Sequence, residues 1–253
     1  MTPFEPAAPE RAAGFLEEAV REGVFPGAVL IYGRVLAGEK ALVLAGRRGL
    51  TRNREPAAWD LIYDLASLTK ILSTGFLVMQ AVTGGRLSLE DDLKKFGWSG
   101  WLGSLKVIHL LSHQSGLAPW RPLYRLPADP DARSSYKKAL EAEEPSALPG
   151  RFTVYSDLNF LILGFILEEL YRLPLGQLFE KEAARPLNLL NTGYCPQKEK
   201  AAPTEDGPRS GGPLDYPGVP RRGPVPLGRV HDDNAAGLGG AGGQAGLFGP
   251  AGE

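Results

Sequence analysis

The sequence contains few of the residues that cross-link a chain or hold a metal. A single cysteine, Cys195, excludes an intramolecular disulfide, and the three histidines occur without the paired Cys/His spacing of a structural zinc site. Any chemistry must therefore come from oxygen and nitrogen groups.

The chain also lacks a charge excess and a long apolar run. Its 28 Lys and Arg residues nearly balance 29 Asp and Glu residues, so no broad basic field is available for a nucleic-acid backbone or an anionic membrane. No stretch approaches the roughly 18 apolar residues of a membrane span, and MTPFEPAAPE at the start does not resemble a secretory signal. We therefore expect a cytoplasmic protein that binds neither nucleic acid nor membranes.

What is present is enough for one full-sized domain, with 253 residues of which 43% are hydrophobic. Residues 12–23 have helical spacing, and the apolar runs 28–32 and 40–45 are typical of an antiparallel hairpin. Further helices are expected at about 66–82, 158–171 and 174–184, the first ending at two glycines.

These elements predict an α+β fold, an antiparallel sheet flanked by helices with a mainly helical region. We expect a sheet-bearing part at 1–60 and about 228–253, a helical part at about 61–195, and a Pro/Gly-rich loop at about 198–228.

The Ser-x-x-Lys pattern occurs three times, at Ser67/Lys70, Ser134/Lys137 and Ser135/Lys138. Only Ser67 opens a long apolar helix, so Lys70 lies over the turn that carries the serine. Free N–H groups and the positive dipole end at a helix start favour an oxyanion, and a neutral lysine can activate a serine. The alternative is an ordinary helix-start serine beside a solvated surface lysine.

A second candidate is Tyr155, which lies just before the most apolar helix of the chain. A phenol beside an ammonium or a helix start loses its proton more readily, so Tyr155 can share or take over the role of base. The alternative is a core tyrosine whose hydroxyl is hydrogen-bonded.

These residues, in this order, resemble the serine β-lactamase and penicillin-binding-protein superfamily, in the branch of class C β-lactamases, D-aminopeptidase-like enzymes and related esterases. Tyr155-Ser156-Asp157 is similar to the family's Tyr-x-Asn motif. The segment HLLSHQSGL at 109–117 resembles its His-Leu-Leu-Thr-His-Thr-Ser-Gly-Leu segment, and Pro186-Leu187-Asn188-Leu189 resembles Pro-Leu-Gly-Met. The similarity runs from about residue 15 to residue 248.

The chain departs from the family pattern in two places. Asp157 replaces the family's Asn, which favours the ammonium form of Lys70 if the two face each other, shifts the base role toward Tyr155, and removes an amide donor for a β-lactam. The third family motif, Lys-Thr-Gly or His-x-Gly, is absent. Its nearest candidate is Gln244-Ala245-Gly246, and the sequence reads as a C-terminally truncated form.

The resemblance implies hydrolysis of an amide or ester through an acyl-enzyme on Ser67, with Lys70 and Tyr155 relaying the proton and no cofactor. Asp157, Gln244 and Gly246 are the expected substrate-binding residues. A small ester, a D-amino-acid peptide or a β-lactam is the implied substrate, and the oligomeric state stays open. The alternative is a catalytically impaired relative that binds penicillin or peptidoglycan peptides, because an oxyanion-hole donor of the missing motif is lost.

Other candidates are weaker. His109 and His113 are spaced as a two-histidine metal face, although structural hydrogen bonding is the better interpretation. The residues 231–234 (HDDN) are interpreted as polar residues that fix a loop. The G-x-G-x-x-G match at 237–242 has no preceding strand, so we interpret it as a flexible loop.

Overall fold

A computed structural model describes residues 8–25, 27–34, 39–46, 62–123, 126, 132–194 and 202. They divide into two compact units. Unit 1 holds the described residues up to Asp64 together with Ala202, and unit 2 holds those from Leu65 to Tyr194. The division expected from the sequence stays a prediction, because its parts beyond residue 202 lie outside the described residues.

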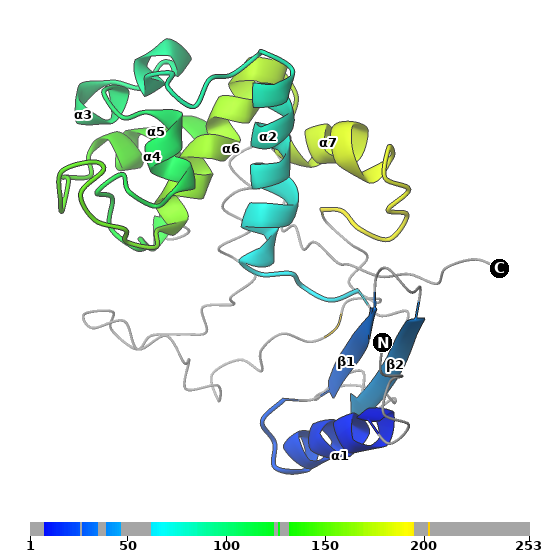
Figure 1. Ribbon diagram of the computed structural model, residues 1–253. Coiled ribbons are helices and arrows are strands. Elements are labelled where there is room, and N and C mark those ends of the chain that lie inside the picture. Colours follow the sequence, from blue (N-terminus) through cyan, green and yellow to red (C-terminus); the bar gives the residue numbers. More distant parts are fainter. Residues whose placement is uncertain are drawn as a thin grey trace. The chain divides into compact units, whose positions relative to one another are not determined.

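Unit 1 contains a helix and a β-hairpin. Helix α1 (Ala8–Arg21) precedes strands β1 (Gly27–Arg34) and β2 (Glu39–Gly46), which pair antiparallel with Val29 opposite Leu44 (Figure 1). Helix α1 packs against both strands. The helix and the hairpin expected from the N-terminal sequence are therefore confirmed.

Unit 2 begins with the helix that follows Ser67. Its first part is a π-helical turn, η2 (Lys70–Gly75), which continues directly into α2 (Phe76–Thr83). Gly85 then takes φ +69°, a left-handed conformation that favours glycine and ends the helix. The expected helix at 66–82 is confirmed, whereas its π-helical winding was not predicted.

Helix α6 (Asp157–Tyr171) forms the centre of unit 2. Every residue from Leu158 to Glu168 is buried, as expected for a helix that is apolar on all sides. Helix α6 packs against α2, and α4 (Val107–Leu111) and α7 (Leu175–Phe179) also contact it (Figure 1). The remaining elements of unit 2 are η3 (Leu93–Phe96), α3 (Gly100–Gly103), α5 (Ala132–Glu141) and η5 (Glu180–Ala184).

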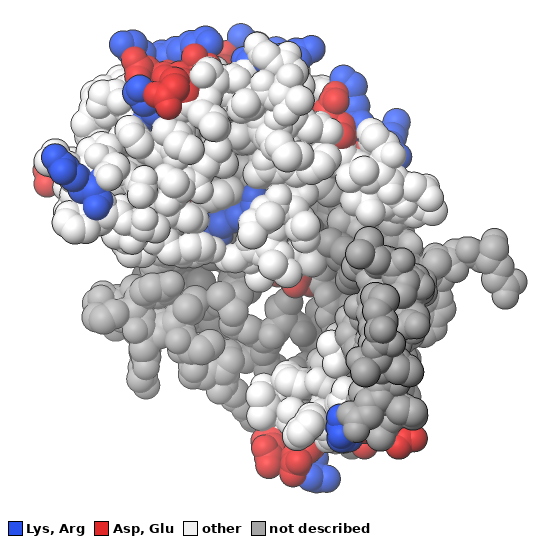
Figure 2. Space-filling model, in the orientation of Figure 1, with Lys and Arg blue, Asp and Glu red and all other residues white. Residues whose placement is uncertain are grey.

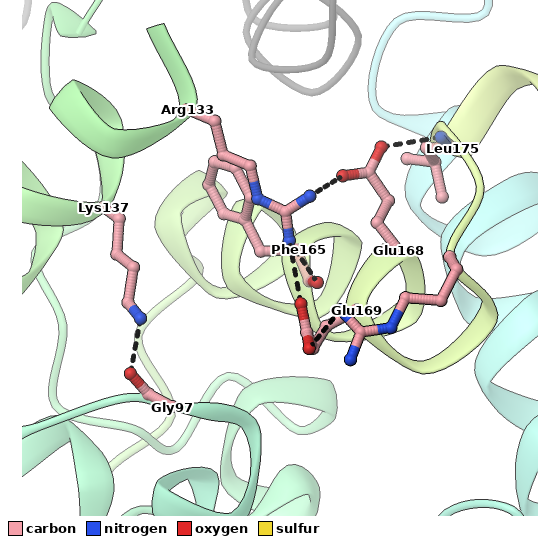
Figure 3. Close-up of polar contacts among 8 residues, drawn as sticks. Gly97, Arg133, Lys137, Phe165, Glu168, Glu169 and Leu175 are labelled. Carbon is pink, nitrogen blue, oxygen red and sulfur yellow. Dashed lines mark hydrogen bonds and ion pairs between the residues drawn. The ribbon is translucent and has the colours of Figure 1, made fainter. Parts of the chain in front are cut away.

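One buried acid joins three helices of this unit. The Glu168 side chain is 1% exposed; its Oε2 lies 3.2 Å from the guanidinium of Arg133 on α5, and its Oε1 accepts the Leu175 N–H at the start of α7 at 2.7 Å (Figure 3). Burial raises the pKa of Glu168 to about 7, although the Leu175 N–H and Arg133 oppose the shift. Glu168 thus links α5, α6 and α7.

Many of the other charged side chains of unit 2, of both signs, lie on the surface. On the face of unit 2 shown in Figure 2 they lie mostly near the border of the view, and most of the area between them is uncharged. Among the residues that the structure describes, no helix has the length and apolar character needed to cross a bilayer.

Candidate active site

Ser67 lies exposed in a tight turn at the start of the η2–α2 helix. The turn is built from i→i+3 hydrogen bonds, in which the N–H groups of Leu68 and Lys70 donate to the carbonyls of Leu65 and Ser67. Ala66, the residue before the serine, takes φ +44°, a conformation that costs a non-glycine residue about 1–2 kcal/mol. One of the strained backbone positions of the described chain therefore lies directly before the candidate nucleophile.

Lys70 lies one turn later and is buried, at 3% exposure. Its Nζ is 3.2 Å from Ser67 Oγ, within hydrogen-bond reach. Because Lys70 is buried, the alternative of a solvated surface lysine is wrong. A buried ammonium needs polar partners, and Ser67 supplies one of them.

Asp157 supplies the second partner. Its Oδ1 lies 2.8 Å from Lys70 Nζ, and its side chain is only 14% exposed. Because Asp157 is the first residue of α6, the helix dipole also favours its carboxylate. The carboxylate of Asp157 therefore faces Lys70.

Tyr155 completes the group from the loop just before α6. Its ring centroid lies 5.2 Å from Lys70 Nζ, so the ammonium is positioned over the aromatic face. With 52% of its surface exposed, Tyr155 is not a core residue, and the core alternative is wrong. The structure therefore brings together four of the six expected site residues, whereas Gln244 and Gly246 lie outside the described residues.

The sequence interpretation missed how close His113 lies to this group. Its ring centroid is 4.6 Å from that of Tyr155, and its Nδ1 accepts a hydrogen bond from the Ser156 N–H at 3.1 Å. Burial lowers the pKa of His113, as does the ammonium of Lys70, against the opposing effect of Asp157. His113 is accordingly a neutral imidazole at neutral pH. The resemblance of the segment 109–117 to a family segment had singled out His113 in the sequence. The spacing of residues along the chain did not show that His113 lies beside Tyr155.

The other candidates have different roles. Lys137, from a second Ser-x-x-Lys match, donates to the Gly97 carbonyl (Figure 3), and Nδ1 of His109 accepts the Lys106 N–H at 3.1 Å. Structural hydrogen bonding of both histidines is therefore confirmed. Within the described ranges no group of three His, Cys, Asp or Glu side chains could hold a metal ion. The segments 231–234 and 237–242 lie outside them.

The arrangement can perform nucleophilic chemistry. A serine hydroxyl is exposed to solvent, a buried lysine contacts it, and a tyrosine lies over the same lysine. An activated serine requires a proton carrier within hydrogen-bond reach of its hydroxyl. It also requires a third group that orients the proton carrier.

Comparisons with known proteins point to one family. The family model described as Beta-lactamase matches residues 12–252. A protein of Escherichia coli O157:H7 named "Putative D-alanyl-D-alanine carboxypeptidase" is 33% identical over 78% of this chain and 50% of its own length. The N-acetylmuramyl-L-alanine amidase of Bacillus subtilis is 31% identical over 88% of this chain and 56% of its own length.

Solved structures agree on the fold. The β-lactamase/D-alanine carboxypeptidase of Pseudomonas syringae superposes with a TM-score of 0.70 at 21% identity, covering 94% of this chain and 62% of that one. SurE in complex with D-Leu superposes with a TM-score of 0.66 at 26% identity, covering 96% of this chain and 50% of that one. The α+β fold of β-lactamases and transpeptidases is confirmed. The chain spans about half the length of the curated relatives it matches.

Proposed function

Because the chain belongs to the beta-lactamase family, we propose that it acts as a serine hydrolase that cleaves an amide or ester through an acyl-enzyme on Ser67. The observation that carries the proposal is the position of Lys70. Its buried Nζ contacts Ser67 Oγ at 3.2 Å and Asp157 Oδ1 at 2.8 Å.

In the proposed reaction, Ser67 Oγ attacks the carbonyl carbon of the substrate and forms the acyl bond while the bond to the leaving group breaks. Lys70 and Tyr155 relay the Oγ proton to the departing amine or alcohol. A water molecule then attacks the acyl carbon, and its proton returns to Oγ by the same route. The acid is released, and the reaction requires no cofactor.

The ion pair with Asp157 gives Lys70 and Tyr155 different roles in the proton relay. The 2.8 Å ion pair is made by the ammonium form of Lys70, so Lys70 orients and stabilises charge while Tyr155 accepts the proton. Half exposed beside the ammonium, Tyr155 is accessible to a substrate bound at Ser67.

The names of the relatives suggest the substrate class. One is named for D-alanyl-D-alanine cleavage, and the SurE structure contains D-Leu. We propose a peptide that ends in a D-amino acid, or an ester of similar size, ahead of a β-lactam. Asp157 cannot donate the hydrogen bond that an asparagine there offers to a β-lactam side-chain amide. The cytoplasmic location and the absence of nucleic-acid and membrane partners stay predictions.

A second candidate is a relative that binds these molecules but turns them over poorly. The Lys70–Asp157 pair favours it, because a lysine that is engaged as an ammonium in an ion pair has no lone pair with which to accept the Ser67 proton.

Pre-steady-state hydrolysis distinguishes the two candidates. The chain is mixed with a chromogenic acetate ester, with a peptide ending in D-Ala-D-Ala, and with its L-Ala-L-Ala counterpart as the stereochemical control. The hydrolase predicts a burst of one product per chain followed by steady turnover, absent in Ser67→Ala. A burst without turnover supports the binding relative, and turnover that survives in Ser67→Ala contradicts both.

A further inference from the structure

His113 occupies an unusual backbone position beneath the loop that carries Tyr155. Its φ is +56°, a left-handed conformation that a non-glycine residue adopts at a cost of about 1–2 kcal/mol. The conformation directs the chain from the end of α4 into the segment 113–119, and its strain persists only because the surroundings compensate for it.

Hydrogen bonds determine which ring nitrogen of His113 carries the proton. The Ser156 backbone N–H can only donate, and it lies 3.1 Å from His113 Nδ1, so Nδ1 is the unprotonated acceptor. The Asn159 amide nitrogen lies 3.2 Å from the same Nδ1. Asn159 is oriented in turn, because its Oδ1 accepts the hydroxyl of the buried Ser115 at 2.5 Å. The proton of the neutral ring is therefore on Nε2.

The backbone of the same segment supports the Tyr155 loop along its length. The Val154 N–H donates to the His113 carbonyl at 2.9 Å, and the Gly150 N–H donates to the Gln114 carbonyl at 2.8 Å. The Ser156 hydroxyl donates to the Ala118 carbonyl at 2.6 Å. Tyr155 thus lies between two residues that are fixed to the segment 113–119.

The His113 ring also lies against two aromatic rings. One side approaches the Tyr155 ring at 4.6 Å between centroids, and Phe160 of α6 lies 5.3 Å away. Because Tyr155 is half exposed, its ring needs a supporting surface to hold one position, and His113 supplies such a surface.

We propose that His113 is a positioning residue for the reaction of Ser67. Its Nδ1 fixes the Ser156 end of the loop, and its ring fixes the orientation of Tyr155 beside Lys70. The inference rests on the proposed function, since Tyr155 must take part in the proton relay for its orientation to affect the rate.

The charged and titratable groups around His113 give the proposal a pH dependence. Lys70 of η2 opposes a charge on the ring, Asp157 of α6 favours one, and Tyr155 is the titratable neighbour in the loop. Protonation at Nδ1 removes the acceptor of the Ser156 N–H. Because the pKa of His113 is below its ordinary value, the loop is released only at pH values below that ordinary range.

A double-mutant cycle on the full chain tests the proposal, with the rate of Ser67 acylation by a fluorophosphonate as readout. His113→Asn keeps a side-chain acceptor and tolerates the left-handed backbone, but removes the ring. It is expected to slow acylation about 10- to 100-fold in the chain that has Tyr155. In the Tyr155→Phe background it is expected to change nothing further, because the hydroxyl that it positions is gone. Thermal unfolding checks that all variants fold.

Each outcome has a distinct meaning. Equal effects of His113→Asn with and without the Tyr155 hydroxyl would mean that His113 has only a structural role. An unchanged rate in Tyr155→Phe alone would refute the relay and, with it, the inference. No labelling of Ser67 in the unmodified chain would refute the proposed function itself.

Nitrogen-15 NMR of the His113 ring supplies a readout that needs no activity. The Nε2–H tautomer is expected throughout neutral pH, and its loss on acidification is expected to coincide with a fall in the acylation rate. That acid limb of the rate profile should be absent in His113→Asn. A ring protonated at Nδ1 at neutral pH would overturn the proposal.

Discussion

At the scale of single residues, Lys70 connects the parts of the site. It is buried, it contacts Ser67 and Asp157 from one nitrogen, and it lies over the ring of Tyr155. A buried ammonium without such partners is strongly unfavourable, so removal of one partner affects both stability and chemistry.

Asp157→Asn separates these two effects. We expect the free energy of unfolding to fall by about 1–3 kcal/mol, because the buried Lys70 nitrogen loses its charged acceptor and keeps only a neutral amide oxygen. We also expect penicillin acylation of Ser67 to become faster, because the new amide can donate a hydrogen bond to the side-chain amide of the ligand. Denaturant unfolding and adduct formation by mass spectrometry measure the two quantities.

The control for Asp157→Asn is Glu180→Gln, which removes a carboxylate from an ion pair with Arg185 on the surface, where both side chains are more than half exposed. Its effect on stability should stay within about 1 kcal/mol, and its acylation rate should not change. A slower penicillin reaction in Asp157→Asn would contradict the assigned role of the carboxylate.

Gly116 belongs to the segment 113–119 that supports the Tyr155 loop, and it has no room for a side chain. Its φ is +82°, and a Cβ there would lie 2.1 Å from the Ala147 carbonyl oxygen. Gly116→Ala should lower the free energy of unfolding by more than about 2 kcal/mol, as measured by denaturant titration. Gly85→Ala is the matched control, with φ +69° and nothing within 4 Å of a Cβ, and should cost only about 1 kcal/mol. Equal losses would mean that the contact with Ala147 relaxes freely.

At the scale of helices and strands, hydrophobic pattern and turn residues predicted α1, the hairpin, the continuous η2–α2 helix and α6, with bounds that differ from the observed ones by a few residues. The spacing of apolar residues shows which face of an element is buried. Each of these elements has either one clear apolar face or apolar residues on all sides. The sequence did not predict the π-helical turn at Lys70–Gly75 or the left-handed backbone conformation of Ala66 and His113. Such features depend on tertiary packing that overrides local preference.

The link that Glu168 makes between three helices predicts an unusual pH dependence. Its folded-state pKa of about 7 lies above the ordinary 4.5, so the folded chain keeps a proton that the unfolded chain has lost in that interval. The stability contributed by this group is therefore present below about pH 4.5 and is lost as the pH rises through about 7.

We expect Glu168→Gln to flatten the fall in the free energy of unfolding between about pH 4.5 and about pH 7, since glutamine keeps an acceptor for the Leu175 N–H and does not ionise. Glu169→Gln changes the same charge one residue along α6 at a side chain that is 39% exposed, and it should keep the fall. Chemical denaturation across this range provides the measurement. An unaltered profile in Glu168→Gln would show that Glu168 titrates normally.

At the scale of the whole molecule, the four residues of the site come from two segments nearly ninety positions apart, and both belong to unit 2. Spacing along the chain paired Ser67 with Lys70, because one helix turn joins them. Spacing alone could not show that Asp157 and Tyr155 lie beside the same lysine, because that placement depends on the fold. The family resemblance anticipated it. Gln244 and Gly246 stay predictions.

The most direct test of the central claim, that Ser67 is an activated nucleophile, is intact-mass spectrometry after incubation with a fluorophosphonate. We predict one adduct per chain, which disappears in Ser67→Ala and persists in Ser134→Ala and Ser135→Ala, the serines of the other two Ser-x-x-Lys matches. An unlabelled chain, or an adduct that survives in Ser67→Ala, would contradict the claim.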